Sequence, residues 1–168
     1  PGGAKLMVEQ GILKDVNEIY GLHIDPNIPS GTFGLRAGAT MAATDRIVIT
    51  IIGKGGHAST PHLCVDPIVT AAEVILAIQT IVSRKVNPLS PCVVSLCQIS
   101  GGTTFNVIPD KVRIIGTVRT LAKELRCKMP ILIEEAIRGI TSLNNASYQF
   151  EYLNGHPPLN NPHQQVDF

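Results

Sequence analysis

The sequence contains no tryptophan, and aromatic residues make up only 4% of its 168 residues, so aliphatic side chains must fill the core. It also lacks an excess of charge. The formal net charge is +1, and Lys or Arg never occurs more than twice in a row. Because nucleic-acid binding depends on a basic patch or stripe, we expect no nucleic-acid partner. The longest apolar runs fall short of the roughly 20 residues that cross a membrane, so we expect no membrane contact.

Cysteine is sparse and is not arranged as a metal site. The four cysteines, at positions 64, 92, 97 and 127, form no CxxC pair and have no zinc-finger spacing. Cys92 and Cys97 fall in one apolar stretch, where we expect buried free thiols. This favours a reducing compartment, and we expect the cytoplasm. The chain begins at Pro1 without an initiator methionine and stops on a polar stretch, so we expect both ends to be cut.

A repeated alternation of apolar patterns predicts the fold. The chain is 44% hydrophobic and 16% charged, which is typical of a globular domain with a core. Period-two or β-branched runs predict four strands, and apolar residues three or four apart predict two long helices. The order β-α-β-β-α-β predicts a ferredoxin-like α+β fold, a four-stranded antiparallel sheet with both helices on one face. The predicted strands cover 46–52, 92–100, 111–120 and 147–153, and the predicted helices cover 66–84 and 122–143.

Local signals add detail to these elements. Asp66 can cap the first long helix, and Pro67 suits its first turn. Pro130 lies inside the second, where it lacks an N–H and clashes with the preceding turn, so we expect a kink or a break. Upstream we expect a short helix over 4–13, strands over 18–24 and possible extended structure over 32–36, then a small-residue linker. Residues 101–109 and 155–162 are predicted to be loops.

The run Gly53-Lys54-Gly55-Gly56-His57-Ala58-Ser59-Thr60-Pro61 follows a strand directly. Its glycines allow positive φ or the close approach of another surface, and we expect a flexible segment that carries His57 at its end. Imidazole can exchange a proton near neutral pH, which favours a functional role, but a solvent-facing or turn-capping histidine is the alternative. The phosphate-loop spacing is absent. Ser59 and Thr60 have no base partner in the sequence, so a nucleophile triad has no support.

Three further residues are candidates, each with a structural alternative. His23 closes an apolar run and is either a metal ligand or a satisfied structural histidine. Asn106, between apolar neighbours, either contacts a ligand or makes an Asx turn. Arg119, near the end of a strand, either binds a carboxylate with its planar fork or forms a surface salt bridge with an acid such as Glu151.

Several of these segments resemble one enzyme family. The strings that carry the likeness are GGAKLMVEQG, YGLHIDP, GTFGLRAGATMAATDRIVITIIGKGGHASTPHLCVDPIV, GGTTFNVIPDKVRIIGTVRT and EYLNGHPP. Together, in this order, they cover nearly the whole chain. The sequence resembles the metal-dependent amidohydrolases that include aminoacylases, hippurate hydrolases and indole-acetyl-amino-acid hydrolases, relatives of dinuclear-metal exopeptidases.

The resemblance implies a division of the chain. Residues 1–43 would end the first segment of an α/β catalytic domain, 44–154 would be an inserted lid and dimerisation domain, and 155–168 would return to the catalytic domain. A homodimer would form through the lid.

The resemblance also implies roles for the candidate residues. His23 would be a metal ligand, and His57 would stabilise the oxyanion in the active site of a neighbouring subunit. Asn106 and Arg119 would bind the substrate. The parent would hydrolyse the amide bond of N-acyl amino acids with two divalent metal ions, zinc or manganese.

One departure from the family limits what this chain can do alone. The family's adjacent glutamates would fall before Pro1, and its other metal-ligand segments would also lie outside the chain. One ligand cannot hold a metal pair, so we expect these 168 residues alone to be inactive. The alternative is a stand-alone ferredoxin-like binding or dimerisation module without catalysis.

Overall fold

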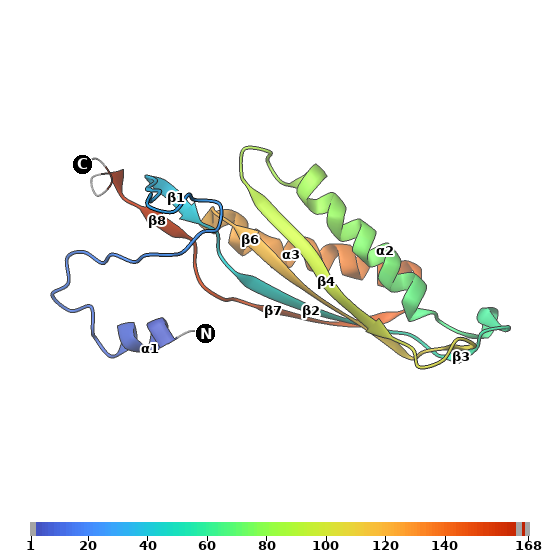
Figure 1. Cartoon of the computed structure of the whole chain (residues 1–168). Helices are drawn as coiled ribbons and strands as arrows, with labels where there is room; N and C mark the ends of the chain where they lie inside the picture. Colours follow the sequence, from blue (N-terminus) through green and yellow to red (C-terminus); the bar gives the residue numbers. More distant parts are fainter. Residues whose placement is uncertain (1–2, 164–165, 167–168) are drawn as a thin grey trace.

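The computed structural model describes residues 3–163 and 166. The described part leaves out residues 1–2, 164–165 and 167–168, which belong to the outer ends of the two predicted flanking segments. A four-stranded sheet with two long helices forms the body of the molecule (Figure 1). The elements in chain order are α1 Gly3–Glu9, β1 Gly38–Met41, β2 Asp45–Ile52, β3 Gly56–His57, η1 Pro61–Leu63, α2 Pro67–Thr80, η2 Ile81–Lys85, β4 Cys92–Gly101, β5 Val107–Ile108, β6 Lys111–Thr120, α3 Lys123–Leu143, β7 Ser147–Leu153 and β8 Leu159–Asn161.

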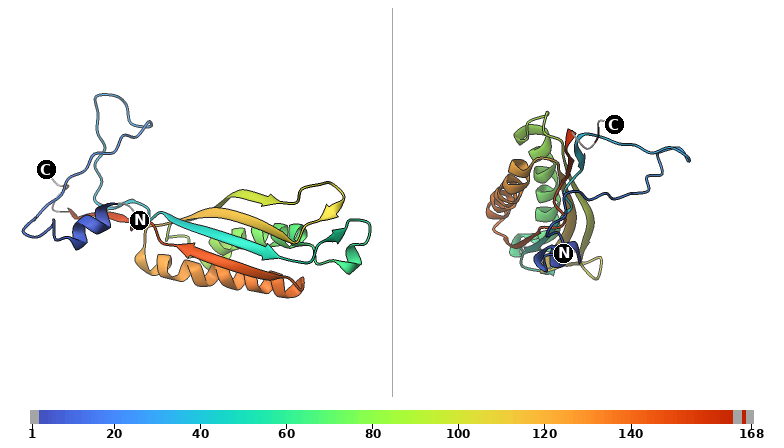
Figure 2. Two further views of the ribbon diagram at one scale, coloured as in Figure 1. Left: turned by 90° about the horizontal axis from the view of Figure 1, so that it is seen from below. Right: turned by 90° about the vertical axis from the view of Figure 1, so that its left-hand side faces the viewer.

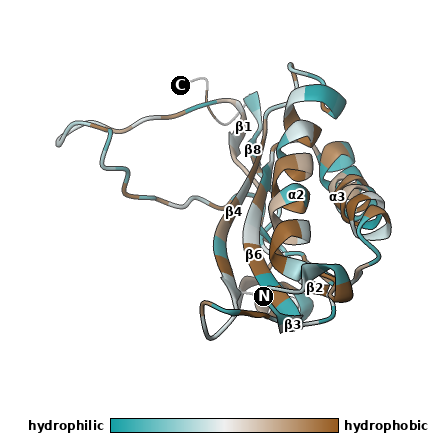
Figure 3. Cartoon of the chain, turned by 90° about the vertical axis from the view of Figure 1, so that its right-hand side faces the viewer, coloured by the Kyte–Doolittle hydropathy of each residue, from teal (hydrophilic) through white to brown (hydrophobic). Residues whose placement is uncertain are grey.

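The sheet has the predicted ferredoxin-like topology. Its strand order is β4-β6-β2-β7, and every neighbouring pair is antiparallel. Two crossovers, each containing one long helix, flank the β4–β6 hairpin, and both helices cover the same face of the sheet (Figure 3). The predicted fold class is therefore confirmed.

The core lies between the sheet and the helices and is aliphatic, as the scarcity of aromatic residues predicts. On β2, Ile47, Ile49 and Ile51 are fully buried, because alternate residues of a strand face the same side. Ile133 and Ile137 of α3 are fully buried against this layer. Brown helix faces in Figure 3 turn toward the sheet in the same way.

The first long helix begins where the sequence predicts. Asp66 accepts hydrogen bonds from the backbone N–H groups of Ile68 and Val69, and Pro67 occupies the first turn. Helix α2 runs on into the π-helix η2, and Pro67–Lys85 is long and apolar enough to cross a membrane by length and composition alone. Val74 and Ile78 are fully buried in the core, so packing against the sheet accounts for part of its hydropathy.

Two local expectations are wrong. The second helix does not break in two at Pro130, because Met129, Ile133 and Ile137 anchor both halves of α3 in the core. Cys97 is exposed, since a β-bulge between Leu96 and Gln98 shifts the register of β4 at this point. Cys92, in contrast, is half-buried, and burial raises the pKa of its thiol.

The segment before the sheet differs most from expectation. Helix α1 ends at Glu9, and residues 18–24 and 32–36 form no strand. These apolar runs lie away from the sheet and find no partner strand among the described residues (Figure 2). Part of the expected linker, β1, instead pairs with part of the loop expected after residue 155, β8, and the two form a short antiparallel ribbon.

Candidate functional site

An arm, defined here as residues 53–64 and 102–110, extends β2 and β6 beyond the end of the sheet. The N–H of Gly53 donates to the carbonyl of Asp110 at 2.8 Å, just past the last sheet pair. Strands β3 and β5 then pair, with His57 opposite Val107. Figure 1 shows β3 at one end of the molecule and the β1–β8 ribbon at the other. The arm therefore carries His57 beyond the body of its own domain.

The glycines of the arm lie where another segment approaches closely. A Cβ at Gly53 would lie 2.1 Å from the carbonyl oxygen of Val65, and one at Gly55 would lie 2.5 Å from that of Ile108. A Cβ at Gly56 would lie 2.6 Å from the sulfur of Cys64. The three glycines keep ordinary φ angles. They are needed because backbones approach closely, and not for positive φ.

The ring of His57 is exposed and is held by its neighbour in the turn. The Ser59 hydroxyl lies 2.8 Å from Nδ1, and the Ser59 backbone N–H donates to the same atom at 3.2 Å. A backbone N–H can only donate, so Nδ1 is an acceptor and the ring proton is on Nε2. The sequence analysis did not reveal this contact between Ser59 and its near neighbour His57.

Asn106 lies next to the His57 turn on the arm. Its carbonyl accepts a hydrogen bond from the N–H of Ala58 at 3.1 Å, and its side-chain oxygen accepts one from the Thr104 hydroxyl at 3.3 Å. No backbone N–H donates to that side-chain oxygen among the described residues, so the Asx-turn alternative is wrong. Phe105 is 98% exposed, which makes the tip of the arm partly apolar.

Arg119 lies at the opposite end of the sheet. It is paired with Val93, one residue from the end of β6, whereas the arm continues from Lys111 at the other end. Eight residues of strand separate the two ends, about 26 Å at about 3.3 Å per residue. Arg119 forms no ion pair with any acid in the described part of the chain, and Glu151 lies on β7, two strands away. The surface salt bridge is therefore not formed.

His23 is exposed in the extended segment before β1. Its Nδ1 lies 2.7 Å from the carbonyl of Ile24, so Nδ1–H donates and the lone pair of Nε2 is free. Asp25 does not orient this ring. Its carboxylate accepts two hydrogen bonds from Asn27, and these hold the pKa of Asp25 below its ordinary value.

The described residues do not fit a metal pair on their own. They contain no group of three or more His, Cys, Asp or Glu side chains that could hold a metal ion. One free imidazole nitrogen at His23 supplies at most one ligand, whereas a metal site needs three or four.

A buried polar cluster at the base of the sheet was not predicted from the sequence. Both carboxylate oxygens of Asp45 accept hydrogen bonds from Arg126, at 2.9 and 2.6 Å. The Tyr152 hydroxyl and the Gly155 N–H also donate to Asp45, each at 3.0 Å. Burial alone would raise the pKa of Asp45, but these donors lower it below its ordinary value. Burial and Asp45 raise the pKa of Tyr152.

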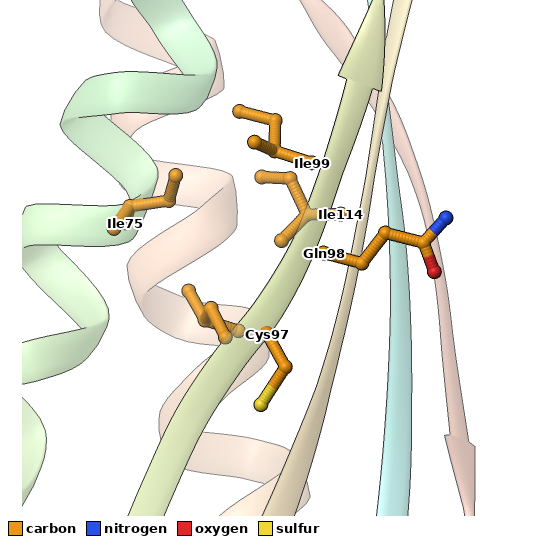
Figure 4. Close-up of a pocket in the computed structure, with 6 residues that line it drawn as sticks. Ile75, Cys97, Gln98, Ile99 and Ile114 are labelled. Carbon is orange, nitrogen blue, oxygen red and sulfur yellow. The ribbon is translucent and has the colours of Figure 1, made fainter.

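A small hollow between α2 and β4 has a volume of about 110 Å³ (Figure 4). Its lining is mainly aliphatic and comes from Ile75, Leu96, Cys97, Gln98, Ile99 and Ile114. In Figure 4, Gln98 points away from the helix, while Ile99 and Ile114 lie on the side of Ile75. The hollow contains no acid or imidazole, so it is a groove at the sheet edge and no catalytic pocket.

Comparison with known proteins gives consistent results. A family model described as the peptidase dimerisation domain matches residues 44–141. An N-acyl-L-amino acid amidohydrolase from Geobacillus stearothermophilus is 44% identical over 161 residues, which cover 96% of this chain and 44% of that protein. An N-acetyldiaminopimelate deacetylase from Leuconostoc mesenteroides is also 44% identical, over 95% of this chain and 43% of that protein. The chain thus spans less than half the length of these relatives.

Two solved structures share the fold of this chain and are also similar to it in sequence. One, described as an aminohydrolase from methicillin-resistant Staphylococcus aureus, has a TM-score of 0.91 and 32% identity, over 99% of this chain and 44% of that one. The other, a dinuclear metal-binding peptidase of the M20 family from Bacillus subtilis, has a TM-score of 0.75 and 32% identity, over 97% of this chain and 40% of that one.

Proposed function

Because this chain belongs to the family of M20 peptidase dimerisation domains, we propose that it is the lid and dimerisation part of a metal-dependent amidohydrolase. The parent protein hydrolyses the amide bond of N-acyl amino acids. Support comes from relatives at 40–44% identity that are named as an N-acyl-L-amino acid amidohydrolase and as deacetylases of N-acetylated amino acids. We expect these 168 residues alone to be inactive, since the described residues contain no group of three or more side chains that could hold a metal ion.

The observation that carries the proposal is the separation of the candidate residues. His57 and Asn106 lie together on the arm, and Arg119 lies at the other end of the sheet, about 26 Å away along β6. One small substrate cannot contact both ends of the same lid. A single active site includes all three residues only if the arm comes from one subunit and Arg119 from the other.

Each residue has a chemical part in such a shared site. The Nε2–H of His57 donates to the oxyanion that forms when the amide carbonyl is attacked, and removal of one such donor typically lowers kcat about 100- to 1000-fold. The amide of Asn106 orients the substrate beside it. The Arg119 guanidinium binds the carboxylate of the amino acid with two parallel hydrogen bonds.

The metal ions of the parent bind chiefly to residues outside this chain. His23 contributes one ligand through Nε2, since its Nδ1–H donates to a backbone carbonyl, the arrangement that metal-bound histidines commonly have. The segment before β1 exposes large apolar side chains, including Leu22, Ile24 and Phe33, which are 81–90% exposed. In the proposed division these residues pack against the rest of the catalytic domain.

Mixing inactive variants of the parent protein tests the shared site. His57→Ala and Arg119→Ala homodimers are each expected to hydrolyse an N-acyl amino acid at about 1% of the wild-type rate or less. An equal mixture of the two, unfolded and refolded together, forms heterodimers with one intact site. With random pairing in a two-fold dimer, the mixture regains about a quarter of wild-type activity.

A mixture of His57→Ala with Asn106→Ala is the matched control. Both residues lie on the same arm, so each site of that heterodimer receives one damaged arm and no activity returns. If the first mixture stays inactive although heterodimers are present, the shared site is wrong. If wild-type parent with bound metal releases no amino acid from any N-acyl amino acid, the proposed activity is wrong as well.

A further inference from the structure

The geometry of the turn after β3 points to a role for Ser59. We propose that Ser59 is a positioning residue, which fixes the His57 ring and keeps its proton on Nε2, ready to donate. The inference rests on the proposed oxyanion role of His57 and adds a residue to it. It depends on two contacts with one atom: the Ser59 hydroxyl at 2.8 Å and the Ser59 N–H at 3.2 Å from His57 Nδ1.

The two Ser59 contacts together favour one of the two neutral forms of the ring. A neutral imidazole has one N–H, and its other nitrogen accepts. Since the Ser59 N–H occupies Nδ1 as a donor, the Nε2–H form is favoured, and the Ser59 hydroxyl then donates to Nδ1 too. An oxyanion needs a donor aimed at it, so the opposite form, with the proton on Nδ1, would present a lone pair to the anion and repel it.

The frame around the ring is held by backbone contacts. The N–H and the hydroxyl of Thr60 both donate to the carbonyl of His57, at 3.0 and 3.2 Å. The N–H of Ala58 donates to Asn106 across the arm. These contacts fix the main chain and leave the ring free to rotate. Among the described residues, Ser59 alone makes hydrogen bonds to the ring of His57.

The same contact does not make Ser59 a nucleophile. In a serine–histidine–acid triad the acid holds one ring nitrogen and the serine faces the other. Here no carboxylate contacts the Nε2 of His57 in the described part of the chain. The second donor on Nδ1, the backbone N–H, also competes for the lone pair that a base would use to take the Ser59 proton.

The first test is nitrogen-15 NMR of the His57 ring in this 168-residue chain at neutral pH. Wild type is expected to show mainly the Nε2–H form. Ser59→Ala removes the closer of the two donors to Nδ1 and leaves only the backbone N–H at 3.2 Å, so the Nε2–H form is expected to lose part of its population. Ser59→Thr keeps a hydroxyl and retains the wild-type signature. Thr60→Ala is the matched control, because its hydroxyl contacts the main chain and not the ring.

The second test is kinetics of the metal-loaded parent. Ser59→Ala is expected to lower kcat about tenfold and to change KM less than twofold. An effect of this size is typical when a side chain that orients a functional residue is removed. Ser59→Thr restores most of kcat. If Ser59→Ala leaves either the ring signature or kcat as in wild type while His57→Ala still abolishes activity, the role of Ser59 is overturned and the proposed function stands. If His57→Ala leaves kcat unchanged, the proposed oxyanion role of His57 fails, and with it the catalytic meaning of the Ser59 contact, while the proposed amidohydrolase activity stands.

Discussion

Asp45 shows how much one side chain contributes at the base of the sheet. Its carboxylate is fully buried and accepts four hydrogen bonds, from Arg126, Tyr152 and Gly155. Gly155 lies two residues after the end of β7, so Asp45 joins the start of the predicted lid to its end. A buried carboxylate without such donors would be costly, and the guanidinium supplies both charge and geometry.

The lowered pKa of Asp45 predicts an acid-sensitive fold. A carboxyl with a folded pKa below its unfolded value of about 3.9 stabilises the protein above that value. This contribution is lost as the pH falls through the folded pKa. Asp45→Asn is expected to lower the free energy of unfolding by about 3 kcal/mol at pH 7, since the half-buried Arg126 guanidinium loses its carboxylate partner. It should also reduce the loss of stability below about pH 4.

Urea unfolding followed by circular dichroism between pH 2 and pH 7 measures both effects. Asp66→Asn is the control, because Asn caps a helix about as well as Asp, and its free energy of unfolding should change by less than about 0.5 kcal/mol. An Asp45→Asn variant with the wild-type stability at pH 7 would show that the cluster adds nothing net.

For single residues, the sequence predicted those within local motifs but did not reveal the buried polar cluster around Asp45. His57 and Asn106 were singled out by local patterns, a glycine run and a polar residue between apolar ones. Asp45 and Tyr152 are 107 positions apart and each looked ordinary, one at a strand start and one in an alternating strand. Only the crossover connections bring them together, and no local pattern encodes that contact.

The arm depends on its glycines for the pairing of β3 with β5. A Cβ at Gly55 would lie 2.5 Å from the Ile108 carbonyl, so Gly55→Ala forces β3 away from β5. The sheet is separate from this contact, and we expect its stability to change little. Amide hydrogen exchange at Ala58, whose N–H donates to Asn106, should become at least about tenfold faster. In the parent, kcat should fall because His57 loses its placement.

Gly139→Ala is the matched substitution in a helix. No heavy atom lies within 4 Å of a Cβ built there, so it is expected to raise the free energy of unfolding by about 0.5–1 kcal/mol. Unchanged exchange at Ala58 in Gly55→Ala would mean that the arm tolerates a side chain at this position, and the close-packing account would be wrong.

Long, periodic elements were predictable, and short ones were not. The four sheet strands and both long helices follow the patterns in the sequence, because each buries one face on a shared core. Strands β3 and β5 have two residues each, too few for a period. The apolar runs at 18–24 and 32–36 resemble strands, but a strand also needs a neighbour, which the described chain does not offer them.

At the scale of the whole molecule, one long edge of the sheet is open. Strand β4 has ten residues and, within the described part of the chain, pairs only with β6, and α2 beside it exposes Val69 and Leu76. Open edges with apolar neighbours invite pairing with another chain. The homodimer proposed for this family member therefore has a suitable surface at β4, and the groove lined by Ile99 lies within it (Figure 4).

This surface yields a prediction for the oligomeric state. The 168-residue chain is expected to sediment as a dimer, and Ile99→Asp to sediment as a monomer at the same concentration, because a desolvated carboxylate at the edge opposes pairing. Ile131→Asp is the matched control: Ile131 is 59% exposed and Ile99 55%, but Ile131 lies on α3, away from the β4 edge. Thermal unfolding of both variants checks that the fold persists. A folded Ile99→Asp chain that remains a dimer would exclude the β4 edge, and the two arms would then have to reach their partner sites through another contact.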